Sequence, residues 1–431
     1  MDNRFSRLFN LTEEQAIEIL DSPADDSDEA SSRYIAASHL VNFNTEAAIA
    51  SLMRAVNNAD PDLDNRIVRR KAMESLGRLK VETALPAIKD CLNDEDAYLV
   101  ENAAWALSEI GTEDATTLEK LAEQLDRPEQ SYRTIIHALA SLDYKPAAER
   151  IKPFTTHEKA PIASAALAAL YRLTGDDSAI PQVMKYLQSD NVNARRGSIQ
   201  DLIDANYYRA IPHIARCPVS SVFRVRAIKS LAKAGMADGK LTFEQVRPIL
   251  ESVLRDHPDD VAMVHMYDQV LEMKLLVQEL YGTDFGRCYL ATQALIEHYA
   301  EAAPVALFES YEATGYNDYG AHYHIMRLFG WLKVADGYDL LVEALHNKAP
   351  QFQKSRTAAA IALGELGDAR AIPELKTALS VPIWDLQYAA IMALDKLGFS
   401  LGSASEHDFA AISGINVADA DWLVQEKLAS M

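Results

Sequence analysis

The chain has little cysteine, and its cysteines are far apart. Cys91, Cys217 and Cys288 are the only three, and no C-x-x-C pair occurs. This spacing argues against a disulfide framework and against a zinc site, and it favours a reducing, cytoplasmic setting with the three thiols buried as small hydrophobic groups. Arg287 precedes Cys288 and would lower the pKa of that thiol, so a transient thioether carrier role stays an open alternative for Cys288.

Long apolar runs and excess positive charge are missing as well. No stretch of about 18 apolar residues occurs, so we expect no membrane span, and residues 1–11 lack the apolar core of a signal peptide. The 63 acidic residues outnumber the 42 basic ones, which gives a net charge of −21. A protein this acidic repels phosphate backbones, so nucleic-acid binding is not expected.

What the chain does have is an internal repeat. Segment 69–79 resembles segment 100–111, and Gly77 and Gly111 take equivalent places 34 residues apart. We expect each glycine to follow the last residue of a helix, where the left-handed C′ position favours glycine. A second phrase places a proline in the first turn of a helix, and it recurs at Pro86, Pro181, Pro212 and Pro373.

This repetition predicts an all-α fold, a right-handed α-α superhelix of the HEAT-like or armadillo type. Further first helices of repeats are expected over 132–142, 162–173, 194–205, 222–235, 355–367 and 386–398. Capping boxes at Thr12 and Thr242 start two more helices. The predicted organisation is a capping helix and acidic loop at 1–30, HEAT-like repeats at 31–240, divergent aromatic-rich repeats at 241–350, HEAT-like repeats at 351–400, and a C-terminal capping helix at 401–431.

The divergent segment concentrates aromatic side chains. Residues 281–340 contain eight of the 18 tyrosines. If 316–331 is helical, its core face holds Ile325, Leu328 and Phe329, and its other face holds Tyr319, Tyr323, Met326, Arg327 and Gly330. A solvated face normally carries Glu, Lys and Gln. We interpret this face as a surface for a flat, apolar ligand with anionic edges, and packing against a neighbouring repeat is the alternative.

These features together resemble one family. The phrases ending in Leu76-Gly77, Ile110-Gly111 and Leu366-Gly367, segment 132–142 and segment 316–331 are similar to those of the E/F clan of cyanobacterial phycobilin lyases. The resemblance spans 33–398 and is nearest to the single-chain phycoerythrobilin lyases. It implies an enzyme without a permanently bound cofactor that binds phycoerythrobilin and attaches it by a thioether bond to a specific cysteine of the phycoerythrin α subunit.

Two other functions stay open. One is a lyase-isomerase that attaches the bilin and also converts it to phycourobilin, although the chain lacks the Asn-His-Cys motif of one isomerising member of the clan. The other is a HEAT-repeat scaffold or chaperone that grips a phycobiliprotein and does no chemistry. The need for a helper lyase subunit or chaperone is left open, as are the oligomeric state and the partner cysteine that is modified.

A linear tetrapyrrole needs cations for its propionates, a carboxylate for its pyrrole N–H groups, flat side chains for its rings and an acid that delivers a proton to carbon. Arg327 is the first candidate for a propionate, and Arg356 or Lys354 is the second. Asp318 is the candidate for the pyrrole nitrogens, and the other catalytic candidates are the proton donors His322 and His324. The candidates for ring contacts and the cavity wall are Tyr316, Tyr319, Tyr323 and Trp331. No metal is implied.

Each candidate has an ordinary structural alternative. Asp318 would also cap the helix that follows it, a role compatible with binding. Arg327 would pair with an acid such as Glu309 or Asp336. His322 lies at the edge of the core face, where structural histidines are commoner than catalytic ones.

Overall fold

The computed structural model describes residues 11–22, 29–399 and 405–431. Within these ranges every regular element is a helix. Most helices follow one another in pairs joined by short turns, and the longer connection 256–272 precedes α17 (Met273–Glu279). The expected all-α, HEAT-like fold is therefore confirmed. The chain divides into two compact units, Met1–Val183 and Met184–Met431, and the division falls inside α12 (Ile180–Tyr186). The five segments predicted from the sequence were drawn where the repeat pattern strengthens or weakens, which is a different criterion from compactness. Their boundaries therefore stay predictions.

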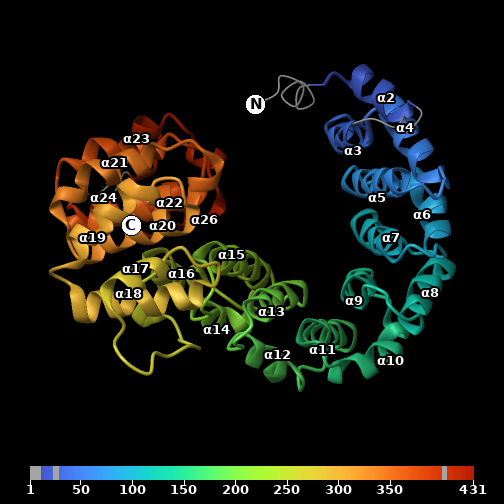
Figure 1. The fold of residues 1–431 in the computed structure, drawn as a ribbon, viewed down its shortest axis with the longest axis horizontal. Coiled ribbons are helices and arrows are strands. Elements are labelled where there is room, and N and C mark those ends of the chain that lie inside the picture. Colours follow the sequence, from blue (N-terminus) through green and yellow to red (C-terminus); the bar gives the residue numbers. More distant parts are fainter. Residues whose placement is uncertain (1–10, 23–28, 400–404) are drawn as a thin grey trace. The chain divides into compact units, whose positions relative to one another are not determined.

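Unit 1 is built from two rows of helices. Consecutive first helices of the repeats pack on one another, and the second helices form the other row (Figure 1). The first row is α3 (Glu29–His39), α5 (Leu63–Arg78), α7 (Ala97–Ile110), α9 (Tyr132–Ser141) and α11 (Ala160–Thr174). The other row is α2 (Glu13–Asp21), α4 (Glu46–Asn57), α6 (Leu85–Cys91), α8 (Ala115–Glu123) and α10 (Ala148–Ile151). Leu, Ile and Ala side chains between the rows form one continuous core.

Most of the local signals read from the sequence hold. Thr12 forms a complete capping box, and at Thr242 the Gln245 side chain accepts a hydrogen bond from the Thr242 backbone N–H at 3.0 Å. All four prolines of the repeated phrase lie in the first turn of a helix, where the missing N–H costs no hydrogen bond. The expected acidic loop after α2 lies largely outside the described residues, as do 1–10 and 400–404.

The two glycines that the repeat aligns have different roles. Gly111 ends α7 with φ of 86°, as expected. Gly77 lies inside α5 instead. A Cβ at this position would come within 2.8 Å of the Trp105 ring and 3.0 Å of Ala106, so only glycine fits. Gly77 is therefore a close-approach residue between two helices, and the expectation that it ends a helix is wrong.

Unit 2 continues with the same kind of helix pairs, and it contains the whole divergent segment. Its earlier helices are α13 (Val192–Asp204), α14 (Ile211–Ala215), α15 (Ser221–Ala237), α16 (Phe243–Arg255), α17 (Met273–Glu279), α18 (Phe285–Tyr299) and α19 (Ala303–Ser310). Its later helices are α20 (Tyr319–Trp331), α21 (Tyr338–His346), α22 (Gln353–Leu366), α23 (Ala371–Leu379), α24 (Trp384–Lys396), α25 (Ser405–Ser413) and α26 (Trp422–Ala429). The expected single closing helix is two helices, because Gly414 turns the chain with φ of 70°.

Helices far apart in the sequence meet inside unit 2. α16 packs against α22. Lys229 on α15 forms an ion pair with Asp421, the N-cap of α26, and Lys427 on α26 bonds Glu251 on α16 at 2.9 Å. The later helices of the unit are thus held against α15 and α16, and this closure positions the candidate site.

The stack α20–α22–α24 is unusually close. A Cβ on Gly330 would lie 2.7 Å from the Cα of Ala362, and one on Gly364 would lie 2.8 Å from the Cα of Ala393. α20 is consequently buried on every side, from Gly320 to Gly330. The expected ligand-facing surface on α20 is therefore mostly helix packing, the alternative that the sequence had left open.

Candidate functional site

Four predicted site residues are divided between the two ends of α20. Tyr316 and Tyr319 are about half exposed, at 55% and 49%, at the start of α20. Asp318 is the N-cap of α20 and accepts hydrogen bonds from the backbone N–H of Gly320 and Ala321, at 2.9 and 2.8 Å. Trp331, at the other end of the helix, packs edge-on against His257. These four side chains do not form one pocket.

The two histidines are buried in aromatic packing. His322 lies against Phe352, with ring centroids 4.6 Å apart, and burial together with the nearby Lys354 charge lowers its pKa to about 4. His324 packs on Phe285, and burial holds its pKa well below the ordinary value. Both rings are therefore neutral at physiological pH. Both side chains are at most 1% exposed, so the positions of both correspond to core histidines.

Two of the predicted cations line a common cavity of about 330 Å³ in unit 2. Arg327 reaches it from α20 and Lys354 from α22. Arg356, the alternative on α22, is not among its walls, because the Arg356 Nε donates to the carbonyl oxygen of Leu345 at 2.9 Å. The remaining wall residues had not been singled out from the sequence, and they lie on four helices: Ser221, Val222, Val225, Arg226 and Lys229 of α15, Val253 and Leu254 of α16, Thr357 of α22, and Trp384 and Asp385 of α24.

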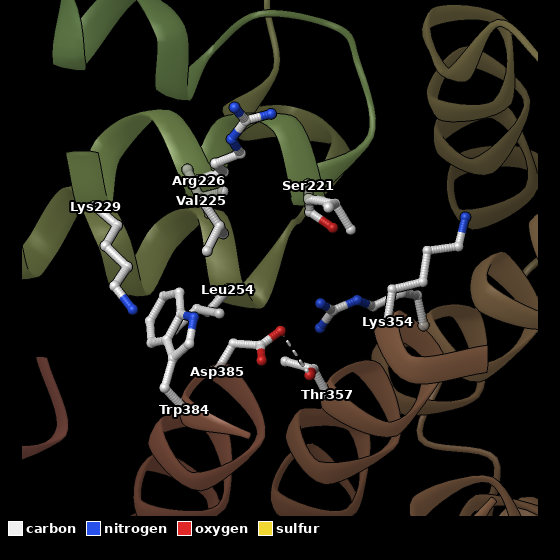
Figure 2. A pocket seen from close by; sticks show the side chains of 12 residues that line it. Ser221, Val225, Arg226, Lys229, Leu254, Lys354, Thr357, Trp384 and Asp385 are labelled. Carbon is white, nitrogen blue, oxygen red and sulfur yellow. Dashed lines mark hydrogen bonds between the residues drawn. The ribbon is translucent and has the colours of Figure 1, made fainter. Parts of the chain in front are cut away.

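One acid faces this cavity. Asp385 lies in the first turn of α24 and accepts a hydrogen bond from the Thr357 hydroxyl at 3.2 Å (Figure 2). Burial raises the pKa of the Asp385 carboxyl, although that hydrogen bond opposes the shift. Beside it, Trp384 presents its ring to Lys229, whose Nζ lies 4.4 Å from the ring centroid. The wall that α24 contributes to the cavity thus combines the flat apolar ring of Trp384 with the Asp385 carboxyl group, whose pKa is raised.

The opposite charges of the cavity are not paired with each other. Among the described residues neither Arg327 nor Asp385 takes part in an ion pair, so neither of the alternatives Glu309 and Asp336 neutralises Arg327. Arg327 is only 2% exposed, and its Nη1 has no hydrogen-bond partner in the described part of the chain. A buried, unpaired guanidinium is costly unless a ligand satisfies it. Arg327 and Asp385 are therefore arranged for a ligand with both acidic and N–H groups.

Two further cations lie at the edges of the cavity. In Figure 2 Arg226 and Lys354 both extend away from Asp385. Arg226 is exposed to solvent. The Lys354 Nζ lies over three rings, 4.3 Å from the centroid of Phe285, 4.6 Å from Tyr319 and 5.0 Å from Tyr323. In a chain of net charge −21, this gathering of cations gives the cavity a local attraction for anions.

The charge on Lys354 is expected to lower the stability of the folded chain near neutral pH. Burial lowers its pKa from 10.5 to about 8. The folded chain therefore bears a disfavoured charge below pH 8, and this cost disappears as the pH rises from about 8 towards 10.5. Lys354→Met should raise the free energy of unfolding by about 1–2 kcal/mol at pH 7 and by almost nothing near pH 10. Denaturant unfolding of both proteins at the two pH values measures this.

Lys240→Met is the matched control, because Lys240 is an exposed lysine of the same unit. It should change stability little at either pH. An equal gain for Lys354→Met at pH 7 and pH 10 would show that the ammonium charge is not the cause.

The three cysteines are buried, as expected. Burial raises the pKa of both the Cys217 and the Cys288 thiols to about 12. Arg287 does not lower the pKa of Cys288, because its guanidinium bonds Glu279 at 3.0 Å. The geometry therefore gives no support to a transient carrier role for Cys288.

No group of three or more His, Cys, Asp or Glu side chains among the described residues could hold a metal ion. No helix in the described ranges is long and apolar enough to cross a membrane.

Comparisons with known proteins identify relatives over most of the chain. The HEAT repeats family matches residues 62–134 and 322–429. The chain is 59% identical over 398 residues to the uncharacterized phycocyanin operon protein Y of Pseudanabaena tenuis (strain PCC 7409), which covers 92% of this chain and 95% of the relative. It is 32% identical over 384 residues to the bilin biosynthesis protein CpeY of Synechococcus sp. (strain WH8020), which covers 86% and 91%.

A shorter relative matches part of the chain. The phycocyanobilin lyase subunit alpha of Nostoc sp. (strain PCC 7120 / SAG 25.82 / UTEX 2576) is 30% identical over 244 residues, which covers 53% of this chain and 86% of the relative. The match to the two longer relatives, by contrast, extends over more than nine-tenths of each of those proteins.

Proposed function

Because this chain belongs to the family of phycobilin lyases built from HEAT repeats, we propose that it holds a bilin in the cavity of unit 2 and attaches it to a cysteine of a phycobiliprotein. The pigment of this proposal is phycoerythrobilin, and the acceptor is the phycoerythrin α subunit. The observation that carries the site is the cavity itself, where Arg327 and Asp385 face the same space without pairing.

The walls of the cavity match the groups of a linear tetrapyrrole. Arg327 suits one propionate, because a guanidinium can bind a carboxylate with two parallel hydrogen bonds. Lys354, the other predicted cation that lines the cavity, suits the second propionate, and Trp384 suits a pyrrole ring. Asp385 suits the pyrrole N–H groups, because a carboxyl oxygen accepts hydrogen bonds from them whether or not the group is protonated. A cavity of about 330 Å³ is at the small end for ligand sites, so it encloses part of the pigment and leaves the reacting ring accessible to the acceptor.

The chemical step is an addition without oxidation or reduction. The acceptor cysteine gives up its thiol proton to solvent as its sulfur bonds the ethylidene carbon of ring A. The electron pair of the ethylidene double bond moves to the neighbouring ring carbon, and that carbon takes a proton, so one proton is lost and one is gained. Asp385 has the raised pKa that a carboxyl needs to supply this proton, whereas His322 and His324 are too buried to reach it. The main contribution of the lyase is to hold pigment and thiol in one orientation.

Co-expression tests this proposal. The chain is produced in cells that make phycoerythrobilin, together with the phycoerythrin α subunit. A parallel culture contains the phycocyanin α subunit instead, because one relative is a phycocyanin operon protein. We expect covalently bound, zinc-fluorescent α-phycoerythrin only when the chain is present. An absorption maximum shifted to the blue would identify phycourobilin and hence a lyase-isomerase. A folded acceptor that stays uncoloured in the presence of bilin would leave only a scaffold role.

A further inference from the structure

A buried polar cluster lies behind the cavity. Asp256 follows α16 with φ of 55° and is 1% exposed. Its carboxylate forms an ion pair with Arg224 of α15 and accepts a hydrogen bond from the Tyr289 hydroxyl of α18, at 2.9 Å. It also accepts a hydrogen bond from the Tyr323 hydroxyl of α20. One carboxylate therefore connects four helical segments of unit 2.

The two tyrosines differ in what else they touch. The Tyr289 hydroxyl bonds Arg224, which is held within the cluster. The Tyr323 hydroxyl instead lies 2.9 Å from the Ser221 hydroxyl and 3.3 Å from the Nε of Arg327. Tyr323 is thus the member of the cluster that reaches the cavity-lining arginine.

The single hydroxyl hydrogen of Tyr323 fixes the direction of its hydrogen bonds to Asp256, Ser221 and Arg327. Burial raises the pKa of Tyr323 to about 12, so the hydroxyl keeps its proton at neutral pH. A tyrosine hydroxyl has one hydrogen to donate. Because that hydrogen goes to the Asp256 carboxylate, the oxygen of Tyr323 accepts from Ser221 and from the Arg327 Nε.

The Arg327 guanidinium is therefore held at its Nε edge by the Tyr323 hydroxyl. Its Nε bonds Tyr323, and the guanidinium carbon lies 5.3 Å from the centre of the same ring, one helical turn away on α20. The Nη1 of Arg327 remains buried without a partner among the described residues. The planar guanidinium offers its two Nη atoms as a second edge, which is the edge that binds a carboxylate with two hydrogen bonds.

We infer that Asp256 and Tyr323 form a positioning device that orients Arg327 to select a ligand with a free carboxylate, an inference that rests on the proposed bilin function. Tyr323 touches Arg327 and not the pigment, so it is a positioning residue. A purely structural role for the cluster would affect folding without affecting the choice between a carboxylate and an uncharged ester.

The test compares two hydroxyl deletions in the full chain. Tyr323→Phe keeps the ring that packs on Phe285 and under Lys354 and removes the bond to Arg327. Tyr289→Phe removes another hydroxyl from the same carboxylate and has no contact with Arg327. Dissociation constants are measured by absorbance titration for phycoerythrobilin and for its dimethyl ester, and thermal midpoints are recorded for each protein.

The unchanged chain should bind the free acid at least about tenfold more tightly than the ester. Tyr323→Phe should weaken binding of the acid about fivefold and leave that of the ester unchanged, whereas Tyr289→Phe should keep the full preference. In an Arg327→Ala background Tyr323→Phe should have no further effect. If Tyr323→Phe does not fold, Ser221→Ala removes the other bond to the same hydroxyl and should also reduce the preference.

The outcomes separate the two proposals. Equal changes for acid and ester in Tyr323→Phe overturn the positioning role and leave the bilin function intact. Equal binding of acid and ester by the unchanged chain also overturns it. A chain that binds neither form contradicts the proposed function, and the positioning role fails with it.

Discussion

Arg327→Ala is expected to reduce covalent bilin transfer at least about tenfold. The substitution removes the guanidinium that the cavity leaves unpaired, and a charge-assisted hydrogen bond to a carboxylate contributes about 1.5–3 kcal/mol. It also leaves Asp385 facing the cavity without an opposing charge on α20. The measurement is the initial rate of coloured α-subunit formation, together with the bilin dissociation constant and the thermal midpoint of the variant.

Arg356→Ala is the informative comparison for this variant. It removes another buried guanidinium from the same stack of helices, but one that bonds a carbonyl oxygen and does not line the cavity. The structure predicts lower stability and transfer within about twofold of the parent chain. If Arg356→Ala lost transfer while Arg327→Ala kept it, the pigment would bind on the other side of α22, where the sequence had placed its second candidate.

Gly330→Ala is expected to lower the free energy of unfolding by about 2–3 kcal/mol. The added methyl group would lie 2.7 Å from the Ala362 Cα and 2.8 Å from its Cβ, so α20 and α22 would have to separate. Arg327 and Lys354 are carried by these two helices, so the same change should also weaken bilin binding. Denaturant unfolding gives the stability, and absorbance titration gives the affinity.

Gly320→Ala on the same helix is the matched control. Its added methyl group would meet nothing closer than 3.3 Å, and both substitutions gain the same intrinsic helix propensity, up to about 1 kcal/mol. Gly320→Ala should therefore change the free energy of unfolding by clearly less than Gly330→Ala does. A Gly330→Ala chain as stable as the parent would show that the two helices separate without cost.

The fold could be predicted because its signals are local. A proline in a first turn, a capping box and an apolar period each act over a few residues, and they recur along the chain. Gly77 shows the limit of this approach. In sequence it looks like Gly111, and only the approach of Trp105 and Ala106 from the next repeat distinguishes a packed glycine from a helix end.

The site could be predicted only in part. Arg327 and Lys354 were within reach because they lie in or next to the aromatic-rich segment. Lys229, Trp384 and Asp385 belong to ordinary-looking repeats, and they join the cavity because α15 and α24 approach one another in three dimensions. The aromatic composition that drew attention to α20 reflects a helix buried on all sides, and burial of His322 and His324 cannot be read from their spacing.

The closure of unit 2 has a consequence for how the protein matures. The walls of the cavity come from α15 and α16 and, much later in the chain, from α20, α22 and α24. The ion pairs of Lys229 with Asp421 and of Lys427 with Glu251 fasten the last helix to α15 and α16. During synthesis on the ribosome, the repeats before α22 can stack as they emerge, but they cannot yet enclose a ligand. The cavity is therefore complete only after α24, which supplies Trp384 and Asp385, has been synthesised.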